Sequence, residues 1–460
     1  RKAMAEKSYV MEDTLRILLE KKRYTSIKDV FTTMNGADIA PILESLAPET
    51  IPVLFRLLPK ELAAETFVEM DTDRQEMLIK GFSDTELHEV INELFVDDAA
   101  ALVDEMPANV VKRILAQADP AMRKEINDIL LYPEDSAGSI MTTEFVNLSP
   151  NMTVAQAITH IRRTGVDKET IYTCYVTEQK QLVGFVTIKC LLLCLDDDKT
   201  IGELMDKNVI SVTTTADKEE VANSLSKYNF VAIPVVDTEN RMVGIVTFDD
   251  AIDVIKEEAA EDMEIMGGIT PSDKTYLRSS PLHLFKNRIP WLMLLMVSAT
   301  FTGMIITRFE KALEQLVVLT AFIPMLMDTG GNSGSQSSVT VIRAISLGEL
   351  EFSDIWTVIW KEIRTAAICG VALSAACFVK VMVVDRMLFN NPEVTVPVAL
   401  VISLTLIATV ILAKLVGCTL PLFAKKAGFD PAVMSSPFIT TIVDALSLLV
   451  YFGIASAMLF

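Results

Sequence analysis

Histidine and cysteine are scarce in this chain of 460 residues, which has three histidines and six cysteines. The histidines lie far apart in the sequence, and no CxxC motif occurs. A site for a soft metal, which needs imidazole or thiolate ligands, therefore has little to use. The scattered cysteines are typical of reduced residues in a packed core rather than of a disulfide framework.

A surplus of positive charge is also lacking, since the formal net charge is −20. Residues 1–288 contain 31 of the 41 Lys and Arg residues and 50 of the 61 Asp and Glu residues. This acidic part is ill-suited to binding nucleic acid. Residues 289–460 carry almost no net charge and consist of long apolar runs, which predicts a membrane domain.

A secretory signal does not precede the acidic part, and we expect this part to stay in the cytoplasm. We predict five membrane spans, at residues 289–307, 315–345, 365–384, 394–424 and 431–460. Basic residues gather at the ends of the spans on the side of the acidic part, for example Lys286, Arg288, Lys425 and Lys426. By the positive-inside rule, the N-terminus is cytoplasmic and the C-terminus lies outside, in a multi-pass protein that we expect in a bacterial plasma membrane.

Residues 1–135 have apolar positions at helical spacing, interrupted at short intervals by proline, as in "DIAPILESLAPETIPVLFRLLPKELAAETFVEM". This pattern predicts short helices joined by tight turns. We expect a helical bundle or a short solenoid whose acidic side chains form a solvated surface.

Residues 137–255 contain an internal repeat. The segment "GSIMTTEFVNLSPNMTVAQAITHIR" is echoed by "GELMDKNVISVTTTADKEEVANSLS", and "CYVTEQKQLVGFVTIKCLLL" by "IPVVDTENRMVGIVTFDDAIDVI". Each unit predicts a helix between short β-branched strands, with a turn at Gly184 or Gly244. The two units resemble a pair of CBS motifs, which implies one α/β Bateman module over residues 136–252. Residues 253–288 are typical of a connecting helix and a polar link.

The segment "IPMLMDTGGNSGSQSS" (residues 323–338) introduces glycine, amide and hydroxyl groups into the second predicted span. Such groups are costly in the hydrocarbon region unless protein buries them or they face water. One interpretation is helix packing, because small residues let membrane helices approach closely. The interpretation that we favour is the wall of a water-filled pathway, formed by Gly330, Gly331, Asn332 and Gln336.

A single carboxylate, Asp444, lies within the last predicted span. A charge at the bilayer centre costs on the order of 3 kcal/mol on insertion scales, so such a residue normally faces a pathway or a partner. The candidate partner is Lys414 of the fourth span, in a structural ion pair. As a pathway residue, a carboxylate near amide and hydroxyl oxygens suits a hard cation such as hydrated Mg²⁺.

Acidic residues also recur in the second CBS unit and along the connecting helix, where several share a helix face. These residues are Asp217, Glu219, Asp249, Asp250, Asp253, Glu257, Glu258, Glu261 and Asp262. Carboxylates so close together repel one another, and a bound divalent cation would relieve the repulsion; a solvated acidic face is the simpler alternative. Because the connecting helix joins the soluble module to the membrane domain, the acidic residues along it are well placed to sense ions and to act on a pore.

Taken together, the motifs resemble those of the MgtE-type magnesium channels. "DIAPILESLAPE", the CBS pair, "PMLMDTGGNSGSQS" and "SSPFITTIVDAL" follow in that order over nearly the whole chain. The resemblance implies a homodimer in the lipid membrane, with an N domain (1–135), a CBS domain, a plug helix and a five-helix pore domain (289–460). The pore would lie on the two-fold axis, with Asp444 attracting the hydrated ion and Asn332 lining the wall. Regulatory Mg²⁺ would bind Asp217, Glu219, Asp250, Asp253, Glu258, Glu261 and Asp262, together with Glu65, Asp97 and Asp98.

The function that this resemblance implies is passive Mg²⁺ influx, closed by cytoplasmic Mg²⁺ and without enzymatic activity. Some members also bind nucleotide, and Thr247 and Asp250 match the T-x-x-D ribose-binding pattern of CBS modules. The first unit has Cys190 in place of that aspartate, which argues against ATP binding. The alternatives are transport of another divalent cation, Mn²⁺ or Co²⁺, and an adenylate-sensing module on a membrane anchor. A chloride channel with CBS domains is disfavoured by Asp444.

Overall fold

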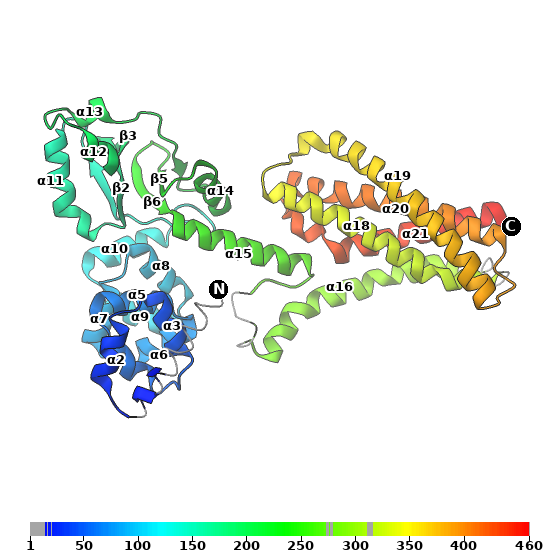
Figure 1. The fold of residues 1–460 in the computed structure, drawn as a ribbon, viewed down its shortest axis with the longest axis horizontal. Helices are drawn as coiled ribbons and strands as arrows, with labels where there is room; N and C mark the ends of the chain where they lie inside the picture. The colour runs from blue at the N-terminus through cyan, green and yellow to red at the C-terminus, as the bar shows by residue number, and fades with distance from the viewer. Residues whose placement is uncertain are drawn as a thin grey trace. The chain divides into compact units, whose positions relative to one another are not determined.

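The structure is a computed structural model that describes residues 14, 15, 17–19, 21–272, 276, 279–310 and 316–459. The chain divides into two compact units, Arg1–Ile255 and Lys256–Phe460. The first unit contains short helices and two small sheets, and the second contains long helices (Figure 1). The predicted fold class, with helical, α/β and helical parts in that order, is confirmed.

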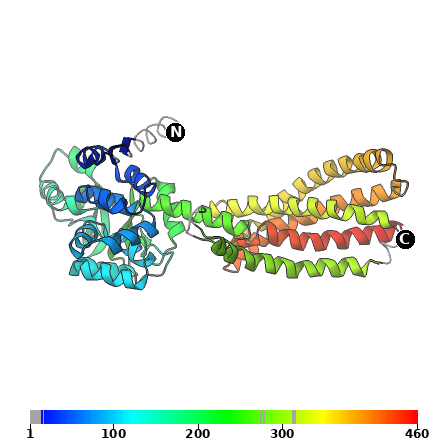
Figure 2. The same ribbon diagram turned by 90° about the horizontal axis from the view of Figure 1, so that it is seen from below.

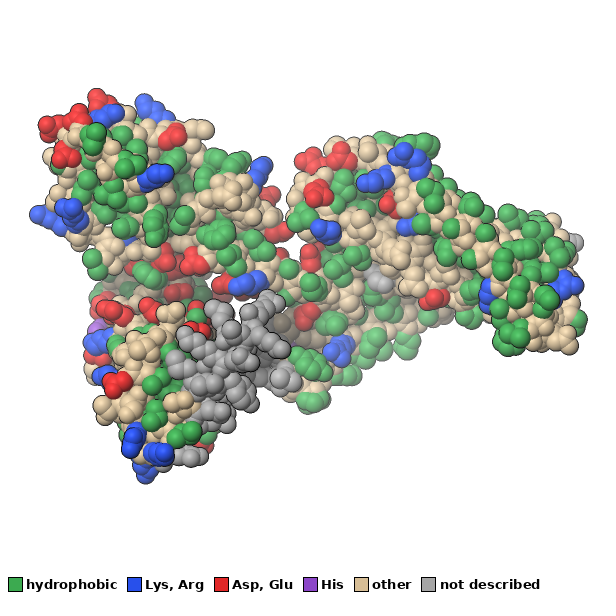
Figure 3. Space-filling view, in the orientation of Figure 1, with side chains coloured by type: hydrophobic (Ala, Val, Ile, Leu, Met, Phe, Trp, Pro, Cys, Tyr) green, Lys and Arg blue, Asp and Glu red, His purple; other side chains and the backbone are tan. Residues whose placement is uncertain are grey.

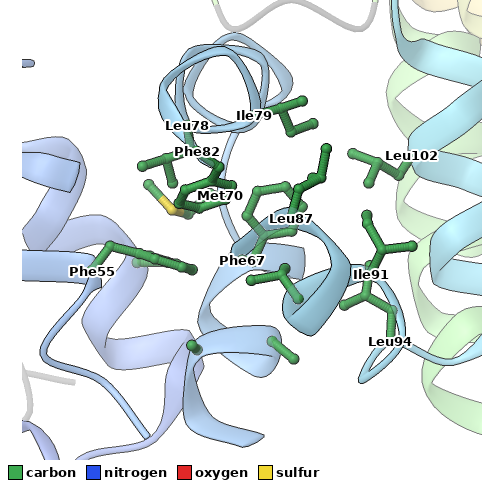
Figure 4. Packing of buried hydrophobic residues seen from close by; sticks show 14 of the residues in the cluster. Phe55, Phe67, Met70, Leu78, Ile79, Phe82, Leu87, Ile91, Leu94 and Leu102 are labelled. Atoms are coloured by element: carbon green, nitrogen blue, oxygen red, sulfur yellow. The ribbon is translucent and has the colours of Figure 1, made fainter. Parts of the chain in front are cut away.

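Short helices fill residues 24–129, as the apolar spacing predicts. They are α2 (Tyr24–Phe31), α3 (Gly36–Glu44), α4 (Ile51–Phe55), α5 (Lys60–Val68), α6 (Thr72–Gly81), α7 (Asp84–Ile91), α8 (Val96–Glu105), α9 (Ala108–Gln117) and α10 (Pro120–Ile129). Ser83 starts α7 with a capping box, in which its hydroxyl accepts from the backbone N–H of Glu86. Phe55, Phe67 and Phe82 meet in the shared hydrophobic core of these helices (Figure 4).

The repeat in residues 137–255 folds as two three-stranded sheets of the same topology. Their strands are β1 (Phe145–Leu148), β2 (Thr170–Glu178) and β3 (Gln181–Thr187), then β4 (Val212–Thr213), β5 (Ala232–Val236) and β6 (Met242–Thr247). In each sheet the first strand is parallel to the second, which pairs antiparallel with the third. The accompanying helices are α11 (Val154–Thr164), the 3₁₀ turn η1 (Gly165–Asp167), α12 (Ile188–Leu193), α13 (Ile201–Leu204) and α14 (Lys218–Tyr228).

The turns predicted at Gly184 and Gly244 are wrong, because both glycines lie inside strands. The chain reverses earlier, where Lys180 and Asn240 have positive φ angles. The two glycines serve close approach instead. A Cβ at Gly184 would lie 2.6 Å from the sulfur of Met205, and one at Gly244 would lie 2.7 Å from the sulfur of Met141. The equivalent contacts in the two sheets reflect the internal repeat.

The predicted connecting helix is α15, which runs from Phe248 to Met266 and contains the boundary between the two units. The second unit continues with α16 (Pro281–Arg308), η2 (Val317–Phe322), α18 (Ile323–Ser346), η3 (Phe352–Asp354), α19 (Ile355–Lys380), the π-helical segment η4 (Val381–Leu388), α20 (Val396–Lys426), η5 (Pro431–Met434) and α21 (Ser436–Leu459). Among the described residues, four helical segments are long and apolar enough to cross a membrane: Pro281–Arg308, Phe352–Leu388, Val396–Lys426 and Pro431–Leu459.

The helix missing from that set is α18, which contains the polar stretch. It has 24 residues, about 36 Å at 1.5 Å per residue, so its length suffices and its composition does not. The long helices run side by side, and α18 packs against both α20 and α21 (Figures 1 and 2). The polar helix is therefore built into the apolar bundle.

Candidate functional site

One face of α18 is polar and uncovered in the single chain. Asp328, Asn332 and Gln336 follow at intervals of four residues, which places them on one helix face, and all three are exposed. Ser333, Ser337 and the other residues that point into the bundle are buried. Lipid cannot satisfy the polar groups of the exposed face, so water or another protein surface has to cover it.

The two glycines of the stretch lie on the buried side of α18. A Cβ at Gly330 would lie 2.7 Å from a methyl group of Thr409, and one at Gly331 would lie 2.8 Å from a methyl group of Thr440. The helix is continuous here, so these glycines provide close packing against α20 and α21 rather than an unwound backbone. In the single chain, the pathway wall predicted at Gly330 and Gly331 is therefore not an exposed surface.

Asp444 lies on α21 and is partly buried. The charge that acts on its carboxylate is that of Asp328, from the polar face of α18. Two carboxylates from facing helices thus lie near one another in the bundle. Like charges in such a setting favour a site at which a cation or water compensates them.

Lys414, the candidate ion-pair partner of Asp444, has a different partner. Its ammonium lies 3.7 Å from Oε2 of Glu362 on α19 and 3.2 Å from Oγ of Ser337, to which it donates. Ser337 in turn donates to Glu362 at 2.5 Å. The structural ion pair considered for Asp444 is therefore wrong, and the lysine is satisfied elsewhere.

A second group of carboxylates lies in the first unit, between the N-terminal helices and the CBS pair. This carboxylate cluster comprises Asp97 and Asp98 in the first turn of α8, Glu144, Glu169, and Asp250 in the first turn of α15. Acidic side chains gather in this region in Figure 3. One oxygen each of Asp97, Glu144 and Glu169 is buried without a hydrogen-bond partner in the described part of the chain. Buried oxygens of this kind call for a cation or water.

The cluster shifts the pKa values of its members upward. Burial, followed by the charge of Asp250, raises the pKa of Asp98 to about 6 and that of Glu169 to about 8. Burial also raises the pKa of Asp97 well above its usual range, with Asp250 as the next cause. The positive ends of α8 and α15 face the cluster and offset part of the repulsion. The rest requires protons or a cation.

A third acidic site lies in the second unit, where α15 meets the membrane helices. Asp262 accepts a hydrogen bond from Ser346 at the end of α18, at 3.3 Å. Burial, and then the charge of Asp430 in the link between α20 and α21, raise the pKa of Asp262. Asp430 starts η5 by accepting from the N–H of Ala432 at 2.8 Å. The predicted residue Asp262 thus acquires an acidic partner from the membrane unit.

The other predicted regulatory residues are distributed along the chain. Asp253 and Glu258 act electrostatically on Asp250 and Asp262 respectively, and Glu261 lies exposed on α15. Asp217 is the N-cap of α14 and accepts from the N–H of Glu219 at 2.8 Å. Glu65 lies exposed on α5. In the described ranges, no group of three His, Cys, Asp or Glu side chains is arranged to hold one metal ion directly.

Sequence reasoning missed Glu144, Glu169 and Asp430. Glu144 and Glu169 are brought together by a backbone hydrogen bond, in which the N–H of Glu169 donates to the carbonyl of Glu144 at 3.0 Å. They lie 25 residues apart in the sequence and match no motif. Asp430 had a local signal, since Asp before Pro commonly opens a turn.

The two side chains of the T-x-x-D pattern in the second CBS unit bond to each other, since the hydroxyl of Thr247 donates a hydrogen bond to the carboxylate of Asp250 at 2.5 Å. In the first unit the hydroxyl of Thr187 instead accepts from the backbone N–H of Cys190 at 3.2 Å. Asp250 therefore belongs to both the nucleotide pattern and the carboxylate cluster.

Comparison with known families and proteins gives matches along most of the chain. The family "MgtE intracellular N domain" matches residues 34–135, and the family "CBS domain" matches residues 137–197 and 201–257. The MgtE family, described as "Divalent cation transporter", matches residues 323–454. A "Magnesium transporter MgtE" from Thermus thermophilus is 33% identical over 98% of this chain and 99% of its own length. Another, from Bacillus subtilis, is 33% identical over 91% of this chain and 94% of its own.

The fold of the first unit is similar to that of a solved structure. The cytosolic domain of the Mg²⁺ channel MgtE in complex with ATP is 33% identical and covers 53% of this chain and 99% of its own, with a TM-score of 0.51. The sequence relatives extend this likeness through the membrane helices. The chain belongs to the MgtE family of magnesium transporters.

Proposed function

We propose that the protein is a Mg²⁺-gated channel through which Mg²⁺ enters the cell. The observation that carries the proposal is the exposed polar face of α18, at Asp328, Asn332 and Gln336, with Asp444 beside it. Carboxylate and amide oxygens suit a hard cation, and Mg²⁺ keeps most of its water and needs few carboxylates. A hydrated ion fits this sparse ligand set better than a dehydrated one.

The exposed face supports a homodimer with the pathway on its two-fold axis. A single chain leaves the face open to lipid, and a second copy related by two-fold symmetry would enclose it with an identical face. The cytoplasmic N-terminus, the outer C-terminus and the location in the plasma membrane belong to the same proposal. An inside-negative potential then favours entry by roughly 4.6 kcal/mol per divalent ion at 100 mV.

Gating follows from the two acidic sites. At high cytoplasmic Mg²⁺, hydrated ions bind within the carboxylate cluster of the first unit, and others bind between Asp262 and Asp430 in the second. Ions at both sites stabilise the closed arrangement of α15. At low Mg²⁺ the uncompensated charges repel and the channel opens. Mg²⁺ shifts this equilibrium only because it binds the closed arrangement more tightly. The absence of a direct three-ligand site among the described residues agrees with binding through the water shell of the ion.

ATP is a second candidate ligand of the CBS pair, since the solved cytosolic domain holds ATP. The second CBS unit has the complete T-x-x-D ribose-binding pattern, with Thr247 hydrogen-bonded to Asp250. In the first unit Cys190 stands in place of the aspartate. An enzymatic activity is not part of the proposal, because the similar proteins are named as transporters.

Ion flux into liposomes containing the purified protein tests the proposal. We expect Mg²⁺ uptake driven by membrane potential alone, with or without a proton or sodium gradient, and inhibition by Mg²⁺ on the cytoplasmic side. Mn²⁺, Co²⁺ and Ca²⁺ tested in parallel separate a magnesium pathway from one for another divalent ion. Flux that requires a second ion gradient would contradict the channel mechanism.

A further inference from the structure

The membrane unit contains a buried ionic cluster that the proposed pathway does not use. Lys414 on α20 is only 6% exposed, and its ammonium contacts Glu362 on α19 and Ser337 on α18 at the distances given above. Burying a charged pair in a membrane helix bundle is costly even when the pair is satisfied. Apolar residues of similar size would pack here without that cost, so this cluster needs an explanation other than stability.

The cluster lies on the side of α18 that points into the bundle. Ser337 is 2% exposed, whereas its neighbour Gln336 is exposed on the polar face. An ion passing along the polar face therefore does not meet Lys414 or Glu362. What the cluster does is fix three helices in one register, because hydrogen bonds to charged groups are directional and apolar packing is not.

Two hydrogen bonds, made by residues adjacent in sequence, connect this cluster to α15. Ser338, the residue after Ser337, is fully buried and donates to the carbonyl of Met434 at 2.7 Å. The next residue, Ser435, donates to the carbonyl of Met266 at 3.2 Å. Met266 is the last residue of α15, where carbonyl groups lack partners within the helix. The end of α15 is thus connected to α18 through η5 and Ser435, so the position of one depends on the position of the other.

We propose that the Glu362–Ser337–Lys414 cluster is a positioning device that holds α18 where the end of α15 can dock, and so sets the Mg²⁺ concentration at which the channel closes. The inference rests on the proposed gating role of α15. With the cluster intact, α18, η5 and α15 form one connected arrangement. Without it, α18 shifts against α19 and α20, docking of α15 weakens, and more Mg²⁺ is required to close the channel.

The test compares the full-length protein with Lys414→Met/Glu362→Leu in planar bilayers. The double variant removes both charges and so leaves no lone buried ion. We expect the half-inhibitory Mg²⁺ concentration to rise by about 2- to 30-fold, the range that coupling through such networks gives. The unitary Mg²⁺ conductance should stay within about twofold of wild type, because the polar face and Asp444 are unchanged.

Two further variants keep the test decisive if the double variant does not fold. Ser338→Ala removes the hydroxyl that donates to Met434 and should also raise the half-inhibitory Mg²⁺ concentration. The reversed pair, Lys414→Glu/Glu362→Lys, restores an ion pair and should have a half-inhibitory Mg²⁺ concentration closer to wild type than Lys414→Met/Glu362→Leu has. As a control, Lys380→Met/Asp385→Leu removes the ion pair between Lys380 and Asp385, whose atoms lie 2.8 Å apart, and should leave inhibition unchanged.

An unchanged half-inhibitory concentration in a folded Lys414→Met/Glu362→Leu variant and in Ser338→Ala would overturn the inference. A fall in conductance without a change in inhibition would also overturn it, since the cluster would then shape the pathway. A wild-type protein that Mg²⁺ does not inhibit at all would overturn the proposed gating, and that result is distinguishable from both.

Discussion

The ammonium of Lys414 lies 3.7 Å from the carboxylate of Glu362. No Lys or Arg of the described ranges forms an ion pair with Asp444, whose charged neighbour is Asp328. The membrane unit thus holds the Lys414–Glu362 pair inside the bundle, whereas Asp444 and Asp328 lie near one another with no Lys or Arg partner among the described residues. The proposed cation pathway accounts for the second arrangement.

Replacing Asn332 or Gln336 by Leu should lower the unitary Mg²⁺ conductance. In the proposed pathway each change removes an amide that would contact the hydrated ion, and a hydrogen bond to a charged group contributes about 1.5–3 kcal/mol, or roughly 10- to 150-fold. Single-channel recording measures the effect. Ser333→Ala is the matched control, because Ser333 is a buried polar residue of the same helix and should leave conductance near wild type. Equal conductance in all three variants would contradict the assignment of the exposed face.

Gly417→Ala should destabilise the membrane unit. A Cβ at this position would lie 2.2 Å from the carbonyl oxygen of Gly334, which is backbone and cannot rotate away. Overpacking of this kind costs about 1–3 kcal/mol or more. The thermal midpoint of the protein in detergent should therefore fall. Gly453→Ala is the control on α21, since a Cβ there meets no heavy atom within 4 Å. An unchanged midpoint for Gly417→Ala would show that α18 and α20 are not in close contact.

The first unit should lose stability as pH rises in the absence of Mg²⁺. The pKa values of Asp98 and Glu169 rise from 3.8 and 4.5 to about 6 and about 8 in the folded protein. Protonation therefore stabilises the fold fully below the lower values, and this stabilisation is lost as pH rises through about 6 and about 8. Thermal unfolding between pH 5 and pH 9 measures the effect.

Mg²⁺ should raise the unfolding midpoint more at pH 9 than at pH 5, because protons compete with the ion for the same carboxylates. Glu169→Gln should flatten the upper part of the pH profile. Stability that increases with pH in the same window would show that the carboxylate cluster is already compensated within the chain.

Asp262→Asn and Asp430→Asn should each weaken inhibition by cytoplasmic Mg²⁺. Either change removes one of the two charges that a bridging ion would join, and coupling energies of 1–3 kcal/mol correspond to about fivefold or more in the half-inhibitory concentration. Recordings with a range of Mg²⁺ concentrations on the cytoplasmic side provide the measurement. Glu349→Gln is the control, as Glu349 is an exposed carboxylate just beyond the end of α18. Wild-type inhibition in both Asp variants would remove this pair from the sensor.

Much of the fold could be predicted from the sequence, because its signals are local or periodic. The internal repeat predicted the two equivalent sheets, and the apolar spacing in residues 1–135 predicted the short N-terminal helices. The hairpin turns were misplaced because a glycine can serve a turn or a close contact equally well, and at Gly184 the contact with Met205 decides.

The partners of charged side chains were less predictable. Glu362 lies 52 residues from Lys414, and only the packing of α19 against α20 brings them together. Glu169 likewise joins the carboxylate cluster through tertiary structure and not through a motif. Sequence spacing locates charges on one helix, whereas pairing between helices depends on register that the sequence pattern does not encode.

Asp444 and the polar face of α18 form the proposed hydrated cation pathway, and the current through Asp444→Asn tests this assignment most directly. This variant keeps the size of the side chain and removes its charge, while Asp385→Asn serves as a control elsewhere in the membrane unit. We predict that purified Asp444→Asn channels in planar bilayers, at a cytoplasmic Mg²⁺ concentration that leaves wild type open, carry Mg²⁺ current at least about tenfold smaller than wild type. A Mg²⁺ current equal to that of wild type would contradict the account.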